Sequence, residues 1–225
     1  MRNCSPKKSA AAVAEKARCR IVLCGGRTPT ATYRRLSQPP FQDRIPWQAM
    51  EFYWGDERCV PADDDRNNAL TAFRTLLDHV PVPPQQIHPV QCDGSPAAAA
   101  QRYEQLLRTR LSGPMPVLDI VLLGLGEDGH TASLFPGSAI LKEKERWAAA
   151  VYSEAEAMHR ISMTPVLLNQ TLLVVFLVTG RKKAPILKQV REGPYDPLNW
   201  PAQSIRPHKG ERIWLVDQAA ASALA

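Results

Sequence analysis

The chain has 225 residues, enough for one sizeable core, and its 44% apolar and 22% charged residues exclude a disordered or fibrous protein. Its 28 basic and 22 acidic residues give a formal net charge of +6, which favours an anionic partner. Because the basic residues are spread along the chain rather than grouped between aromatic residues, we expect a small anion and no nucleic acid.

The N-terminal segment does not have the pattern of a targeting signal. Residues 1–8 include the basic residues Arg2, Lys7 and Lys8, but no apolar stretch follows them, so we expect no secretory signal. The longest apolar run, Leu172 to Val178, is much shorter than the roughly 18 residues of a membrane span. The five cysteines are odd in number and lack CxxC spacing, which argues against disulfides and a zinc site. We therefore expect a cytoplasmic protein with free thiols and no membrane partner.

Short apolar runs along the chain have the length and β-branched content of strands that are buried on both faces. They are Ile21 to Cys24, Phe52 to Trp54, Ile120 to Leu123, Leu172 to Val178 and Ile213 to Val216. This pattern is typical of a parallel sheet.

Helical patterns lie between these strands. Ala69 to Val80 carries apolar residues at i, i+3 and i+4 spacing, and Ser95-Pro96 supplies an N-cap followed by a proline that opens a helix. A third helix, including Lys183 to Val190, is expected after Gly180. Alternating strands and helices predict an α/β fold with a mostly parallel sheet, in a single domain spanning residues 1–225. Such sheets bind ligands at the carboxyl ends of their strands.

The first strand ends in a glycine turn, Gly25-Gly26-Arg27-Thr28-Pro29. We expect Thr28 to cap a helix and Pro29 to open it. Exposed N–H groups at a helix start favour a phosphate, and Arg27 adds positive charge. The residues alone leave two possibilities open, an anion site and a capped turn that binds nothing.

The second strand leads into Asp56, Glu57 and Arg58 after Gly55. Two carboxylates beside a guanidinium are more often a surface ion pair than an active site. Their position at the end of a strand nevertheless makes them candidates.

The segment Gly124 to Gly137 is the most informative one. It contains GxGxxG directly after a strand, which is typical of dinucleotide binding. However, Glu127 and Asp128 would put negative charge where a pyrophosphate should lie, and Pro136-Gly137 interrupts the required helix. We instead interpret the glycines as presenting Asp128 and His130 together. With a reference pKa of about 6.5, a histidine can act as a base near neutral pH, and a carboxylate can orient it. The alternative is a loop histidine bonded only to backbone.

Further candidates are weaker. Arg160 and Lys183 could hold a phosphate, although each alone is more typical of a solvated charge. The chain lacks metal-ligand spacing among its histidines and lacks the GxSxG pattern of a nucleophilic serine. Neither metal-assisted hydrolysis nor an acyl-enzyme is therefore predicted.

The chain resembles the 6-phosphogluconolactonase family in six ordered motifs between about Ile21 and the C-terminus. The motifs are GGRTP at Gly25, WGDERCVP at Trp54, GLGEDGHTASLFPGS at Gly124, RIS at Arg160, TGRKKA at Thr179 and WLVD at Trp214. The resemblance implies the Rossmann-like three-layer α/β sandwich shared with glucosamine-6-phosphate deaminases and ribose-5-phosphate isomerases. It also implies hydrolysis of 6-phosphoglucono-1,5-lactone in the pentose phosphate pathway, without cofactor or metal, and we expect a monomer.

The resemblance also assigns roles at the matching positions. Residues that line the phosphate site are Gly25, Gly26, Arg27, Thr28, Arg160 and Lys183. His130 takes a proton from the water that attacks the C1 carbonyl, Asp128 orients the His130 ring, and Asp56 and Arg58 lie close to the substrate.

Two alternatives remain. The deaminase of glucosamine 6-phosphate shares GGxTP and DGH, but that family has Asn-Glu where this chain has Leu134 and Phe135, and phenylalanine cannot relay a proton. The other alternative is a domain that binds a sugar phosphate without catalysis. The family usually has a longer amphipathic helix before the first strand than Ser9 to Ala17, so we expect a shortened or divergent N-terminus.

Overall fold

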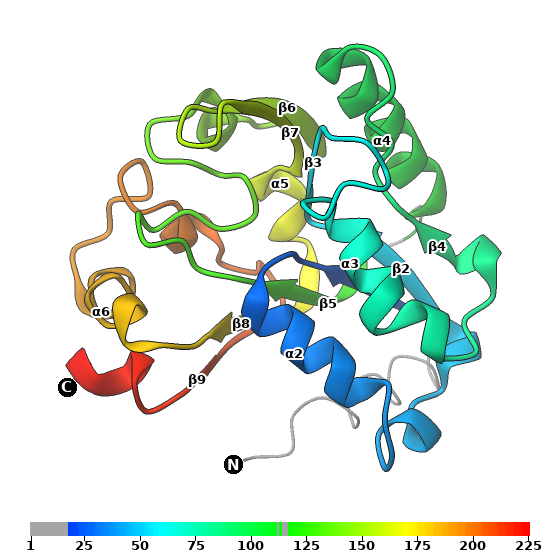
Figure 1. The fold of residues 1–225 in the computed structure, drawn as a ribbon. Helices are drawn as coiled ribbons and strands as arrows, with labels where there is room; N and C mark the ends of the chain where they lie inside the picture. Colours follow the sequence, from blue (N-terminus) through cyan, green and yellow to red (C-terminus); the bar gives the residue numbers. More distant parts are fainter. Residues whose placement is uncertain (1–17, 112, 114–116) are drawn as a thin grey trace.

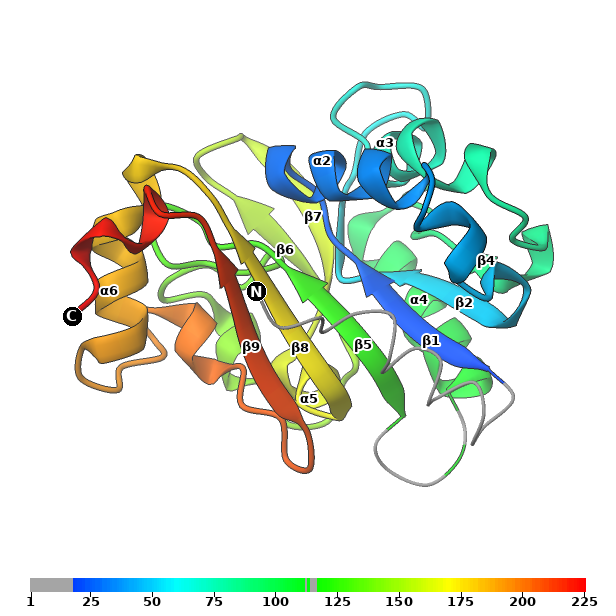
Figure 2. The same ribbon diagram turned by 90° about the horizontal axis from the view of Figure 1, so that it is seen from below.

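The computed structural model describes residues 18–111, 113 and 117–225. In this part of the chain, six parallel strands form a sheet in the order β4-β2-β1-β5-β8-β9. The strands are β1 (Cys19–Leu23), β2 (Met50–Trp54), β4 (Ile87–His88), β5 (Leu118–Leu123), β8 (Thr171–Val178) and β9 (Glu211–Val216). All five predicted strands are among them, and their carboxyl ends point to the same edge of the sheet (Figure 2).

Helices accompany the sheet, which confirms the predicted α/β fold. They are α2 (Arg27–Leu36), α3 (Asn68–Thr75), α4 (Pro96–Arg110), α5 (Pro165–Leu168) and α6 (Ala184–Glu192). Helices α4 and α5 lie behind the sheet in Figure 2, while Figure 1 shows α2 on the opposite side from α4. No helix in the described ranges is long and apolar enough to cross a membrane.

A second, antiparallel sheet was not predicted from the sequence. Its strands are β3 (Asp56–Arg58), β7 (Met158–Met163) and β6 (Ala148–Ser153), in the order β3-β7-β6. Strand β3 is charged, β7 mixes basic and apolar residues, and β6 is mostly alanine, so none of them resembles a buried apolar run. This sheet carries Asp56, Arg58 and Arg160.

The helix predicted from Ala69 to Val80 is shorter in the structure. Helix α3 ends at Thr75, Leu76 leaves helical geometry with φ −140°, and a single 3-10 turn spans Leu77–His79. Val80 precedes Pro81, and a residue before proline is disfavoured in the helical region, so Val80 is extended, with φ −135° and ψ 150°. By contrast, α4 begins as predicted, with the Ser95 hydroxyl accepting from Ala98 N at 3.2 Å.

Two buried tyrosines hold the backbone at the carboxyl ends of the neighbouring strands β1 and β2. The Tyr33 hydroxyl of α2 accepts from Cys24 N and donates to Cys24 O, at 3.0 and 2.8 Å. The Tyr103 hydroxyl of α4 does the same for Trp54, also at 3.0 and 2.8 Å. Both strands diverge into loops at these points, where strand pairing no longer satisfies the backbone. The two side chains therefore fix the starting points of the loops that follow β1 and β2.

A buried hydrogen bond between Glu51 and His88 joins β2 to β4. Glu51 Oε1 lies 3.0 Å from His88 Nε2, and both side chains are buried. Burial alone raises the pKa of the Glu51 carboxyl, but the hydrogen bond and charge of His88 and the nearby Arg20 lower it below its ordinary value of 4.5. The folded state therefore favours the ionised form.

This depressed pKa predicts loss of stability in acid. The contribution of Glu51 is present above the unfolded-state pKa and is lost as the pH falls through the lower folded-state pKa. Glu51→Gln is expected to lower the free energy of unfolding by about 1.5–3 kcal/mol at neutral pH. Urea unfolding between pH 7 and pH 3 tests this: the difference between wild type and variant should shrink in acid, and a constant difference would contradict the linkage.

Among the described residues, Cys24, Cys59 and Cys92 are free thiols. Cys4 lies outside the described residues. The same is true of Ser9 to Ala17, the expected remnant of the N-terminal helix.

Candidate active site

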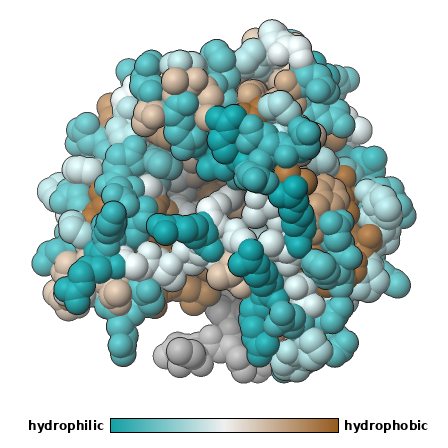
Figure 3. All heavy atoms as spheres, in the orientation of Figure 1, coloured by the Kyte–Doolittle hydropathy of each residue, from teal (hydrophilic) through white to brown (hydrophobic). Residues whose placement is uncertain are grey.

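One cavity of about 1270 Å³ opens at the carboxyl ends of the parallel strands, and every residue predicted for the site lines it. These residues are Gly25, Gly26, Arg27, Thr28, Asp56, Arg58, Asp128, His130, Arg160 and Lys183. Figure 3 shows this face of the molecule, hollowed near its centre and surrounded by hydrophilic side chains. The topology thus brings together residues that are separated by up to 158 positions in the sequence.

The glycine turn after β1 forms one wall of the cavity. Gly26 has φ +110° and serves as the N-cap of α2, which begins at Arg27. The prediction that Thr28 caps the helix is therefore wrong, because Thr28 lies inside the first turn of α2. Its hydroxyl instead bonds the Thr179 hydroxyl at 2.6 Å, which joins α2 to the end of β8. Gly26 can take this role because it has no Cβ to oppose a positive φ. The start of α2 faces the cavity and favours an anion there.

The loop after β5 forms a second wall and presents His130. Asp128 Oδ1 accepts from His130 N at 3.1 Å and lies 2.5 Å from His130 Nδ1. The loop closes on itself because Gly126 N donates to His130 O at 2.8 Å. A Cβ on Gly126 would lie 2.2 Å from His130 Nδ1, so this close approach needs a glycine. The chain forms turns and an isolated bridge here, which agrees with rejecting the dinucleotide motif.

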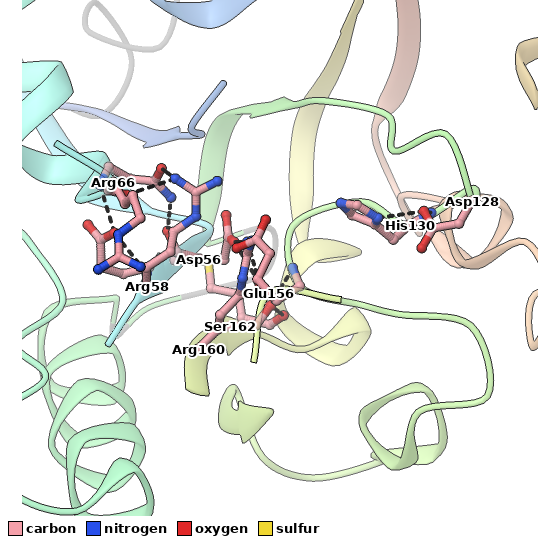
Figure 4. Close-up of polar contacts among 12 residues, drawn as sticks. Asp56, Arg58, Arg66, Asp128, His130, Glu156, Arg160 and Ser162 are labelled. Carbon is pink, nitrogen blue, oxygen red and sulfur yellow. Dashed lines mark hydrogen bonds and ion pairs between the residues drawn. The ribbon is translucent and has the colours of Figure 1, made fainter. Parts of the chain in front are cut away.

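Electrostatics favour one arrangement of the proton in this pair. Burial alone raises the pKa of Asp128, but its hydrogen bonds with His130 and the imidazole charge lower it below the ordinary value. An ionised carboxylate only accepts hydrogen bonds, so in the neutral imidazole this contact requires the proton on Nδ1 and leaves Nε2 with its lone pair. Figure 4 shows the second ring nitrogen turned away from Asp128, toward the side of the pocket that holds Asp56. His130 can therefore accept a proton from a molecule in the cavity.

A buried polar network supports the opposite wall. Asp56 Oδ2 accepts from Ser133 Oγ at 2.6 Å and from Arg160 Nη1 at 3.2 Å. The second terminal nitrogen of Arg160 bonds Glu156, and its guanidinium lies over the Phe135 ring at 5.6 Å. Arg160 is 4% exposed, so it is a buried partner of two carboxylates rather than a solvated charge. Its Nε atom is buried and has no hydrogen-bond partner within the described part of the chain.

Arg58 reaches the cavity beside this network. Its Nη1 donates to Asn68 Oδ1 and to Arg66 O, each at 2.8 Å. The neighbouring Glu57 is fully buried and accepts from the backbone N–H groups of Arg58, Asn68 and Ala69. Burial raises the pKa of Glu57 to about 7, although these three hydrogen bonds oppose the shift. Glu57 therefore joins β3 to the start of α3 and does not act as a surface ion pair.

Lys183 lies at the end of the 3-10 turn Arg181–Lys183, which follows β8. Gly180, with φ +96°, precedes this turn, and its N–H donates to both carboxylate oxygens of Asp217, at 3.1 and 3.0 Å. This contact fixes the turn against the end of β9. Lys183, which follows β8, and the start of α2, which follows β1, thus line the same cavity from two strand ends on either side of β5.

Several side chains of the site were not singled out from the sequence. Asn68, Ser133 and Glu156 contact the predicted residues directly. Asn68 begins a helix and Glu156 lies in a turn between β7 and β6, positions where polar residues are common. Of the three, Asn68 lines the cavity, while Ser133 and Glu156 contact residues that do. The pairing of β3 with β7 sets Arg58 opposite Arg160.

The chain is similar to known proteins over most of its length. Residues 4–214 match the family model described as glucosamine-6-phosphate isomerases/6-phosphogluconolactonase. A 6-phosphogluconolactonase of a Nostoc species is 38% identical, covering 95% of this chain and 88% of the relative. One from Mycobacterium tuberculosis is also 38% identical, with the same coverage. The crystal structure of the Thermotoga maritima 6-phosphogluconolactonase superposes with a TM-score of 0.81 at 29% identity, covering 93% of this chain and 90% of that one.

Proposed function

Because the chain belongs to the glucosamine-6-phosphate isomerase/6-phosphogluconolactonase family, we propose that it hydrolyses 6-phospho-D-glucono-1,5-lactone to 6-phospho-D-gluconate. This reaction belongs to the oxidative part of the pentose phosphate pathway. The observation that carries the proposal is the His130–Asp128 pair, which faces a cavity that also holds Lys183 and the start of α2.

In the proposed mechanism, His130 acts as the general base. Nε2 takes a proton from water as the water oxygen attacks C1 of the lactone, while Asp128 holds the imidazole and stabilises its charged form. The tetrahedral intermediate then collapses, the bond between C1 and the ring oxygen breaks, and the imidazolium returns its proton to that oxygen. The products are the free carboxylic acid and a hydroxyl group, so water supplies every added atom.

We propose that Arg58 stabilises the charge that develops on the carbonyl oxygen. Its guanidinium lies in the cavity on the opposite side from His130 and is held in one orientation by Asn68 and the Arg66 carbonyl (Figure 4). A fixed donor is effective here because it need not reorganise as the charge forms. Asp56 lies beside it and is available for the substrate hydroxyl groups.

The phosphate of the substrate is proposed to bind Lys183 and the N–H groups at the start of α2. Lys183→Ala is expected to raise KM by about tenfold or more while kcat changes little, since phosphate contacts are made equally in the ground and transition states. Steady-state kinetics on freshly prepared lactone measure both constants. Lys182→Ala, which removes a neighbouring charge outside the cavity lining, is the matched control. A fall in kcat alone would contradict the assignment.

The direct test is a lactonase assay coupled to 6-phosphogluconate dehydrogenase, with spontaneous opening of the lactone subtracted. A parallel assay measures deamination of glucosamine 6-phosphate. Lactonase turnover without deamination is expected, because Phe135 stands where the deaminases use glutamate and its ring packs 5.0 Å from the His130 ring. Deamination, or binding without turnover, would favour one of the two alternatives instead.

A further inference from the structure

We propose that Asn68 is a positioning residue for the reaction, because its side-chain amide holds the Arg58 guanidinium in place and ties it to the backbone of Asp56. This inference rests on the proposed function. It adds a residue that does not touch the reacting atoms but acts through one that does.

The contacts of the Asn68 amide define this role. Its Oδ1 accepts from Arg58 Nη1 at 2.8 Å, and its Nδ2 donates to Asp56 O at 2.9 Å. Asn68 is 4% exposed and lines the cavity. Since the two ends of the amide have opposite hydrogen-bonding roles and different partners, the side chain is fixed in one orientation.

Gly25 makes room for this amide. A Cβ on Gly25 would lie 1.9 Å from Asn68 Oδ1 and 2.5 Å from Asn68 Cγ. The amide therefore lies directly against the glycine turn that opens toward the phosphate site, as well as against β3. One buried side chain thus contacts the loop after β1 and the strand after β2, the two segments that carry Gly25, Asp56 and Arg58.

The helix does not need the Asn68 side chain for its own stability. The N-cap of α3 is Asn67, whose Oδ1 accepts from Leu70 N at 2.8 Å. Glu57 accepts from the N–H groups of Asn68 and Ala69. With these N–H groups satisfied by other residues, the amide of Asn68 is directed to Arg58 and Asp56.

Arg58 needs such a partner. Its buried Nε atom has no hydrogen-bond acceptor among the described residues, so Nη1 makes the contacts that orient the guanidinium. Without Asn68, only the carbonyl of Arg66 would hold Nη1, and rotation of the side chain would move its free donor atoms relative to the substrate. Loss of an orienting partner behind a functional group typically lowers activity by about 10- to 100-fold.

The experiment compares neighbouring asparagines with different roles. Asn68→Ala is expected to lower kcat by about 10- to 100-fold with KM changed by less than about threefold, because Arg58 acts mainly on the transition state. Asn67→Ala, which removes the helix cap, should lower the melting temperature by a few degrees and leave kcat near the wild-type value. If both variants lose stability and activity in parallel, the role is only structural and the proposal is overturned.

A double-mutant cycle with Arg58→Ala gives the decisive readout. If Asn68 acts through Arg58, adding Asn68→Ala to Arg58→Ala changes kcat by less than about twofold, whereas independent effects multiply. Should Asn68→Ala fail to fold, Asn68→Ser replaces it under the same criteria, because its hydroxyl keeps a polar group but is too short to reach Arg58. Wild-type protein without lactonase turnover would overturn both this inference and the proposed function; normal turnover by a folded Asn68 variant would overturn only this inference.

Discussion

Replacing His130 by alanine is expected to lower lactonase turnover by about 10²- to 10⁴-fold, the usual contribution of a general base. The protein should still fold, since His130 lies at the surface of a loop with 30% of its side chain exposed. The loop also keeps its closing bond, because Gly126 N bonds the backbone carbonyl of residue 130 and not the ring. KM should change less than kcat, since the phosphate anchors remain.

The measurement needs two controls. The first corrects for spontaneous opening of the lactone, and the second tests whether replacing a histidine outside the cavity also lowers turnover. His159→Ala supplies the second, because His159 is exposed on β7 and packs against Tyr152 outside the cavity. That variant should retain wild-type kcat. Near-normal turnover by His130→Ala after subtraction of the spontaneous rate would reject the general base, and an equal loss in both variants would point to a nonspecific effect.

The side of the site that carries His130 was predictable because it is local in sequence. Asp128 and His130 are two positions apart, and glycines at positions 126 and 129 indicate a tight loop directly after a buried strand. The geometry of such a pair depends on a few backbone torsions, which the glycines make accessible. The residue types, together with their position directly after a strand, were therefore sufficient to predict the Asp128–His130 pair and its place at the edge of the sheet.

The opposite wall depends on contacts between distant segments. Arg160 Nη1 meets Asp56 across 104 positions, and Ser133 meets Asp56 across 77. No local pattern indicates the antiparallel pairing of β3 with β7, because charged strands lack the apolar signal on which strand prediction depends. Asn68 and Glu156 lie only 10 and 4 positions from their partners Arg58 and Arg160, but no motif singles them out. The sequence motifs predicted residues that line this wall of the cavity, but not which of them form hydrogen bonds and ion pairs with one another.

This network gives Arg160 a second role beside the predicted phosphate contact. Asp56 and Arg160 are both buried, with side-chain exposures of 6% and 5%, and their charges compensate each other. Removing one partner of a buried pair leaves an uncompensated charge, which destabilises by about 3–5 kcal/mol. The pair also orients Asp56 toward the cavity, so its loss is expected to affect both folding and catalysis.

Arg160→Ala is therefore expected to lower the free energy of unfolding by about 3–5 kcal/mol and to reduce turnover, rather than only to raise KM. Urea unfolding followed by fluorescence measures the first effect. Arg74→Ala, which breaks an exposed ion pair with Asp65, is the matched control and should unfold near the wild-type midpoint. Asp56→Asn in the Arg160→Ala background should recover part of the stability, because it removes the charge left without a partner. If Arg160→Ala is as stable as the wild type and only KM rises, the guanidinium serves the phosphate alone and Asp56 is held by Ser133.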